Sequence, residues 1–250
     1  MTQKSLEQER KDRLALLFRT ASERNIGSIM LCEGEHLLGI KRIIARLAQI
    51  LDPRHFHALR TTGRDSYRPG MPFLSPYWKN LPRFGDLVVY EHGYYSRLVR
   101  FRESGDAGKK TVNQIIQQIN DFERTLNDNH YRVFKFNFTR PLERLENDYK
   151  KRIKKTELRE TLKKRYKELI HSYSSQKKFY TEIRAKTDTP HAPWFEPPSD
   201  RNSRLEAAVF DYLIAKMEEN LEINSMAAVR SFDAAMDRVR EIRRTGNAPA

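Results

Sequence analysis

The hydrophobic positions of this chain fall into two patterns, short apolar runs and longer stretches with a 3.6-residue period. Short runs bounded by turn residues predict buried strands, and the longer period predicts amphipathic helices. Apolar runs lie near residues 28–32, 55–59, 87–90 and 133–138, and helical stretches cover 3–24, 37–51, 112–126, 200–216 and the tail beyond 226. Strands and helices that alternate in this order predict an α/β fold with a parallel sheet.

The segment after the first predicted strand has the glycine spacing of a phosphate-binding loop. Gly34 and Gly39 are five residues apart, between an apolar run and a helix, where backbone N–H groups can face an anion. The residue after the second glycine is normally a lysine, and here it is Ile40. Lys41 follows, but a shift of one residue turns a helical side chain by about 100°. We therefore expect Gly34, Gly39, Lys41 and Arg42 to bind phosphate in a loop that lacks its usual lysine.

The formal net charge of +14 is concentrated in one part of the chain. Residues 140–180 hold 14 Lys and Arg against 6 Asp and Glu, so more than half of the excess lies in about a sixth of the sequence. Such a field attracts polyanions, and its contribution falls steeply with salt. The plain alternative is a solvated helix face. Because the segment is helical in pattern but poor in large apolar residues, we expect a mobile basic lid.

The length of 250 residues suits one domain with an appendage. We expect an N-terminal helix over 1–27, a core over 28–140 and 187–216, a helical lid over 141–186 and a C-terminal helix over 217–250. The sequence has no apolar run near the roughly 20 residues of a membrane helix, and its first residues are polar and charged. We therefore expect a cytoplasmic protein without a membrane partner.

Four segments, in this order, resemble motifs of the polyphosphate kinase 2 family, whose members have the P-loop kinase fold. They are Glu33-Gly34 with Leu51-Asp52-Pro53-Arg54, Tyr77-Trp78-Lys79-Asn80-Leu81-Pro82 with Gly85-Asp86, Asn120-Asp121-Phe122-Glu123-Arg124, and the run from Lys186 to Trp194. The resemblance implies a P-loop-kinase-like three-layer α/β sandwich with a parallel sheet and a basic helical lid. It also implies polyphosphate as phosphoryl donor or acceptor, a nucleoside mono- or diphosphate as its partner, and Mg²⁺.

The catalytic motifs depart from the family pattern. Where the family's phosphate loop reads roughly Gly-x-Asp-x-x-Gly-Lys-Gly, this chain has His36 at the aspartate and Ile40 at the lysine. Where the family has Asp-Arg-Ser-Trp-Tyr after a strand, the chain has Glu91-His92-Gly93-Tyr94-Tyr95. Glu91 keeps a carboxylate for magnesium, whereas His92 is not permanently charged near neutral pH. The resemblance thus implies Glu91 and Arg97, at the family's later arginine, as the remaining catalytic residues, with Glu91 as metal ligand.

These losses affect the positioning and charge balance on which phosphoryl transfer depends. We expect a weakened or absent native reaction, and three interpretations stay open. The chain is a phosphotransferase that recruits Lys41, Arg42 and Arg97, or an inactive pseudoenzyme that binds polyphosphate or an active paralogue, or a basic nucleic-acid-binding module.

The resemblance places the basic segment in the family's lid, which favours a polyphosphate track over a solvated face. The expected contacts are Lys150, Lys151, Arg152, Lys154 and Lys155 on the lid, with Arg60, Arg64 and Arg68 in or beside a glycine- and proline-rich loop. Tyr149, Tyr166 and Tyr173 interleave with the lid cations, as in surfaces that stack single-stranded nucleic acid.

Two further interpretations stay open. His36, Glu91 and His92 lie near the carboxyl ends of neighbouring predicted strands, where two imidazoles and a carboxylate could bind Zn²⁺ or Fe²⁺. The tail carries one apolar stripe that could pair with another helix, including that of a second copy in a homo-oligomer.

Overall fold

The computed structural model describes residues 3–34, 37–60, 70–154, 157, 159–198 and 201–245. The strands are β1 (Gly27–Glu33), β2 (Phe56–Arg60), β3 (Leu87–Glu91), β4 (Tyr131–Asn137) and β5 (Trp194–Phe195). The helices are α1 (Gln3–Glu23), α2 (Leu37–Ile50), α3 (Ser75–Lys79), α4 (Tyr94–Glu103), α5 (Lys109–Asp128), α6 (Leu142–Lys154), α7 (Arg159–Thr187), α8 (Asn202–Leu221) and α9 (Ser225–Thr245).

The five strands form one parallel sheet in the order β2-β3-β1-β4-β5. β1 lies in the centre and is buried along its whole length, which explains its continuous apolar run. In the strand register, Cys32 lies opposite Glu91, Glu33 opposite Asn137, and Arg60 opposite Glu91. Arg60, Glu91, Glu33 and Asn137 therefore share the carboxyl edge of the sheet, where ligands bind in folds of this kind.

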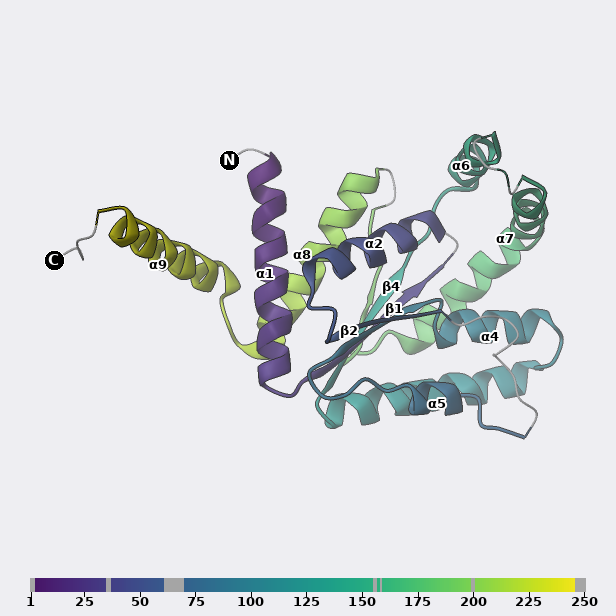
Figure 1. Cartoon of the computed structure of the whole chain (residues 1–250). Helices are drawn as coiled ribbons and strands as arrows, with labels where there is room; N and C mark the ends of the chain where they lie inside the picture. Colours follow the sequence, from purple (N-terminus) through teal and green to yellow (C-terminus); the bar gives the residue numbers. More distant parts are fainter. Residues whose placement is uncertain are drawn as a thin grey trace.

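Helices cover both faces of the sheet and complete a three-layer sandwich (Figure 1). One apolar cluster joins α1, α2 and α8 to the sheet, with Leu17, Ile43 and Phe210 at its centre. The other joins α4, α5 and the second half of α7 to the opposite face, through residues such as Leu98 and Ile116. The predicted P-loop-kinase-like α/β sandwich with a parallel sheet is confirmed.

The basic lid consists of two helices that leave the carboxyl edge of the sheet after β4 (Figure 1). α6 and α7 pack on each other, and α7 then returns to the core, where Phe179 and Ile183 are buried against α4 and α5. The nearly continuous helical pattern of 141–186 is confirmed, although it is divided between two helices.

Three elements were missed by the sequence patterns. α3 has only five residues, with a proline at its second position, and is too short to show a helical period. α4 contains Arg97, Arg100 and Arg102, and these arginines obscure its apolar face, although Leu98 and Val99 are buried. β5 has only two residues and follows a proline, so it has no periodicity to detect.

The N-terminal helix α1 packs beside α8 (Figure 1). α1 is held to α8 by ion pairs from Arg10 to Asp211 at 2.6 Å and from Arg13 to Glu218 at 3.1 Å. α9 extends away from the body on the side opposite the lid, and Phe232 on its apolar stripe is 64% exposed (Figure 1). Pairing of this stripe with another helix stays a prediction. Within the described ranges, the structure has no helix long and apolar enough to cross a membrane.

Candidate phosphate-binding site

The loop after β1 begins with a glycine that no other residue could replace without distortion. Gly34 is buried and has a φ of 103°, and a Cβ added to it would lie 2.4 Å from the carbonyl oxygen of Phe138. Gly39, by contrast, already lies in the first turn of α2. Ile40 is fully buried in the apolar cluster between α2, α1 and α8. The position that normally carries the lysine therefore faces the core, and His36 lies outside the described residues.

The two cations after Ile40 point in different directions. Lys41 is exposed on α2. Arg42 donates a hydrogen bond from Nε to Glu206 of α8 at 3.1 Å, and Arg46 binds the other oxygen of the same carboxylate at 3.1 Å. Arg42 would have to leave Glu206 to bind a phosphate, whereas Lys41 is available.

Glu91 and His92 lie together at the end of β3. Oε1 of Glu91 is buried, accepts no hydrogen bond from the part of the chain that the structure describes, and lies 3.9 Å from Nε of Arg60. His92 has a φ of 64°, and its Nδ1 lies 3.1 Å from the hydroxyl of Ser96. Burial lowers the pKa of His92 to about 4, and the charges of Arg100, Arg60 and Lys41 act in the same direction. His92 is therefore neutral near pH 7.

Glu33 is a site residue that the sequence patterns did not identify. Its fully buried carboxylate accepts hydrogen bonds from the backbone N–H groups of Gly93, Tyr95 and Ser96, and from the Ser96 hydroxyl. Burial raises its pKa to about 7, although hydrogen bonds from Ser96 and the charge of Arg100 act against this shift. Glu33 thus occupies the N-terminus of α4, where the helix dipole favours a negative charge.

Arg97 is buried and held by an aromatic residue. Its Nη1 donates a hydrogen bond to the carbonyl of Phe73, and its guanidinium lies over the Phe73 ring at 4.6 Å from the centroid. Burial lowers its pKa from the ordinary arginine value. Any contact of Arg97 with a substrate would compete with these two interactions.

The residues at the end of β3 fit the magnesium ion that the resemblance implies. Oε1 of Glu91 accepts no hydrogen bond from a described residue, and Mg²⁺ in phosphate sites is commonly held by one or two carboxylates together with substrate phosphates. Glu33 does not fit, because both of its oxygens already accept hydrogen bonds. The described residues contain no group of three His, Cys, Asp or Glu that could hold a metal ion. The zinc or iron site of His36, Glu91 and His92 stays a prediction, because His36 lies outside the described residues.

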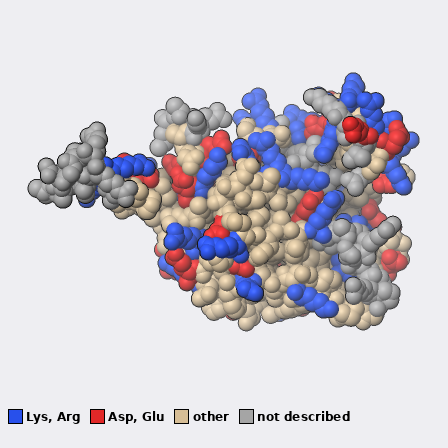
Figure 2. Space-filling view, viewed as in Figure 1, with Lys and Arg blue, Asp and Glu red and all other residues tan. Residues whose placement is uncertain are grey.

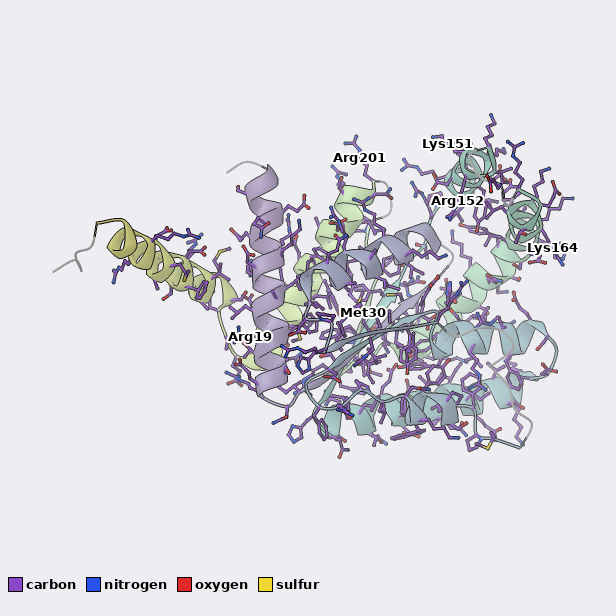
Figure 3. The ribbon with its side chains drawn as sticks, in the orientation of Figure 1. Arg19, Met30, Lys151, Arg152, Lys164 and Arg201 are labelled. Carbon is purple, nitrogen blue, oxygen red and sulfur yellow. The ribbon has the colours of Figure 1, made fainter. Side chains whose placement is uncertain are left out.

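The lid presents its cations to solvent. Lys150, Lys151, Arg152 and Lys154 are all exposed on α6. Figure 3 shows Lys151 and Arg152 on α6 beside Lys164 on α7, and Figure 2 shows further Lys and Arg side chains over this side of the molecule. Arg60 lies at the carboxyl edge of the sheet, opposite Glu91 in the strand register. Lys155, Arg64 and Arg68 lie outside the described residues.

The family model for polyphosphate kinase 2 matches residues 2–225. The chain belongs to the polyphosphate kinase 2 family. It is 26% identical over 188 residues to the polyphosphate:AMP phosphotransferase of Pseudomonas aeruginosa, and 22% identical over 189 residues to NDP-polyphosphate phosphotransferase 1 of Ruegeria pomeroyi. These alignments cover 73% and 76% of the chain but 37% and 62% of the relatives, so the chain matches only part of their length.

The fold is also that of the solved polyphosphate kinase 2 from Arthrobacter aurescens TC1. The two structures superpose with a TM-score of 0.78 at 18% sequence identity, covering 90% of this chain and 83% of the other. At this identity the likeness establishes the fold alone.

The family motifs distant from the loop have structural roles here. Glu123 and Lys135 form a fully buried ion pair at 2.7 Å, and the hydroxyls of Tyr94 and Tyr95 donate to the same carboxylate. Trp194 donates from Nε1 to the Thr187 hydroxyl at 2.9 Å, and Asn120 donates to the carbonyl of Lys186. These bonds fix the end of α7 on the core, so the motif from Lys186 to Trp194 braces the return of the lid.

The tyrosines of the lid do not form a stacking surface. Tyr149 and Tyr173 are buried, because the packing of α6 on α7 covers them. Tyr149 packs against Tyr166 with ring centroids 5.6 Å apart, and Tyr173 donates to the carbonyl of Arg140. The prediction that these tyrosines could stack nucleic-acid bases is therefore wrong for Tyr149 and Tyr173, which weakens the nucleic-acid interpretation.

Proposed function

We propose that this family member binds polyphosphate along its lid and a phosphate group at the carboxyl edge of the sheet, and that it transfers phosphoryl groups much more slowly than relatives with an intact loop. The observation that carries the proposal is the burial of Ile40 at the position of the loop lysine. The second substrate is a nucleoside mono- or diphosphate, in agreement with the activities for which the two relatives are named.

Slow transfer follows from the charges that are missing. The moving phosphoryl group needs cations that balance its charge in the transition state. Neither Ile40 nor a neutral His92 supplies one. Removal of a single preorganised donor in other enzymes reduces the rate by about 10²–10³.

Binding is supported by the exposed cations of α6 and by the open Glu91 carboxylate. A magnesium ion held by Glu91 would neutralise phosphate oxygens and polarise the phosphorus toward attack. The remaining contribution of the chain is to hold polyphosphate along Lys150, Lys151, Arg152 and Lys154 and to shield the site beneath the lid. Because these cations neutralise phosphates in exposed positions, binding should weaken strongly as salt rises.

The test measures polyphosphate affinity over a series of salt concentrations. A lid variant replaces Lys150, Lys151, Arg152 and Lys154 with Ala. A control variant replaces four exposed arginines elsewhere with Ala, namely Arg19, Arg54, Arg124 and Arg240. We expect the lid variant to bind more weakly and with a shallower salt dependence than the control, although both lose the same charge. Equal effects in the two variants would contradict a polyphosphate track on the lid, and stronger binding of single-stranded RNA at matched ionic strength would favour a nucleic-acid-binding module.

A further inference from the structure

Arg100 carries a guanidinium group that no described residue satisfies. Its Nε and Nη2 atoms are buried and have no hydrogen-bond partner in the described part of the chain. Arg100 lies one helical turn after Ser96, so both side chains leave the same face of α4. Since helical side chains tilt toward the N-terminus, the guanidinium extends back toward Ser96 and the residues that Ser96 contacts, Glu33 and His92.

Two further cations approach the same place from other elements. Lys41 comes from the start of α2 and Arg60 from the end of β2. Arg60 lies opposite Glu91 in the strand register, and Lys41 lies in the second turn of α2, which begins just after the carboxyl end of β1. Arg60 lies 3.9 Å from Glu91, and Lys41 forms no ion pair with a described residue. We call Lys41, Arg60 and Arg100 the cation cluster.

The acids at this edge do not balance the cation cluster. Glu91 is a single carboxylate beside Arg60. Glu33 accepts four hydrogen bonds from the start of α4, and its pKa of about 7 leaves it only partly ionised at neutral pH. Two buried guanidinium nitrogens without hydrogen-bond partners among the described residues are costly, and such groups persist where a ligand completes them. An anion with several oxygens, such as a phosphoryl group, is the chemical complement of three converging cations.

We propose that Arg100, together with Lys41 and Arg60, binds a phosphoryl group at the carboxyl edge of the sheet, where the loop lysine and the motif arginine are missing. The inference rests on the proposed function, because that function makes phosphate the bound anion. It adds a residue outside the aligned family motifs, since Arg100 lies nine residues after Glu91 and beyond the last motif arginine, Arg97.

The test uses pyrophosphate without Mg²⁺, a probe too short to follow the lid and bound by protein cations alone. Arg100→Leu is compared with Arg124→Leu as a control. Arg124 lies on α5 near the amino end of β4, away from the carboxyl edge of the sheet, and pairs with Asp121 at 2.9 Å. We expect Arg100→Leu to raise the pyrophosphate Kd by about 10- to 100-fold, as for loss of one charge-assisted hydrogen bond. Arg124→Leu should change it less than about twofold.

Thermal unfolding separates this role from a structural one. Without ligand, Arg100→Leu should unfold at the same or a higher temperature than the wild type, because two buried nitrogens without hydrogen-bond partners are removed. Arg100→Lys keeps the charge and should bind pyrophosphate with an intermediate Kd. A variant that unfolds earlier while keeping wild-type affinity would assign Arg100 to the fold and overturn the proposal.

Titration of ADP in parallel identifies the source of the phosphate. Weaker binding of ADP alone assigns the cation cluster to the nucleotide, weaker binding of pyrophosphate alone assigns it to polyphosphate, and loss of both indicates a shared subsite. If the wild type binds pyrophosphate and ADP, and Arg100→Leu binds both with the same Kd as Arg124→Leu, the role of the cation cluster is overturned while the proposed function stands. A wild type that binds neither pyrophosphate, ADP nor long polyphosphate would overturn both.

Discussion

Ser96 donates hydrogen bonds to Glu33 from both its backbone N–H and its hydroxyl, and so joins the first turn of α4 to the last residue of β1. The same hydroxyl lies 2.9 Å from the hydroxyl of Tyr180 in α7 and 3.1 Å from Nδ1 of His92. The residue before the phosphate loop is therefore connected to the lid helix through one serine.

The raised pKa of Glu33 makes stability depend on pH. A carboxyl whose pKa rises from 4.5 in the unfolded chain to about 7 in the fold stabilises the protein fully below pH 4.5, and this contribution is lost as the pH rises through 7. The unfolding free energy of the wild type minus that of Glu33→Gln should fall by about 3 kcal/mol over this window and then level off. Urea unfolding of both proteins between pH 4.5 and 8 measures this difference. The contributions of the other carboxyl groups to the pH dependence are the same in both proteins and cancel. A flat difference would contradict the assigned burial.

The buried ion pair between Glu123 and Lys135 should be essential to the fold. Lys135→Met leaves the Glu123 carboxylate buried without its cation, which typically costs about 3–5 kcal/mol. The matched control is Lys163→Met, which breaks the exposed pair with Glu160 at 2.7 Å and should have little effect. Urea unfolding compares the two variants directly. Similar losses of unfolding free energy would show that the ion pair between Glu123 and Lys135 is not desolvated.

The glycine at the start of the loop provides a test that separates strain from steric clash. Gly34 and Gly105 both have positive φ, 103° and 80°, but a Cβ at Gly34 would meet Phe138 at 2.4 Å, while nothing lies within 4 Å of one at Gly105. Gly105→Ala should cost about 1 kcal/mol from backbone strain alone. Gly34→Ala should cost at least twice as much. Equal losses by thermal unfolding would mean that the loop can move away from Phe138.

Restoring the family lysine at position 40 should not repair the site by itself. Ile40→Lys places an ammonium in an apolar cluster, and we expect a loss of several kcal/mol in unfolding free energy. Ile40→Val, which keeps the apolar character, should lose only about 0.5–1.5 kcal/mol. Unfolding and nucleotide phosphorylation are measured on the same samples. An Ile40→Lys protein that is as stable as the wild type and transfers phosphate faster would show that position 40 faces the phosphate.

Much of the fold was predictable from the sequence because its strands are buried. The run from Ile29 to Cys32 is apolar, as expected of a central parallel strand, and apolar residues such as Ile115 and Ile119 repeat at a period of 3.6 residues along their helix. The loop position was predictable for the same reason, since Gly34 follows the strand directly.

The missed features depend on contacts between distant segments. Glu33 finds its partners in α4, about 60 residues later, so nothing near it in the sequence indicates that it will cap a helix. The burial of Tyr149 and Tyr173 depends on how α6 packs against α7, which an interleaved charge pattern does not determine. The sequence did not indicate a binding role for Arg100 either. It is one of three arginines in α4, and only the structure shows that two of its nitrogens are buried without hydrogen-bond partners among the described residues.

The initial rate of nucleotide phosphorylation at saturating polyphosphate and Mg²⁺ tests the central claim most directly, when measured beside the polyphosphate:AMP phosphotransferase of P. aeruginosa. Titration first establishes saturation, so that weak binding cannot be mistaken for slow chemistry. We predict saturable polyphosphate binding with a rate at least about 100-fold below that of the relative, as expected from loss of the loop lysine. A rate equal to that of the relative would contradict the account.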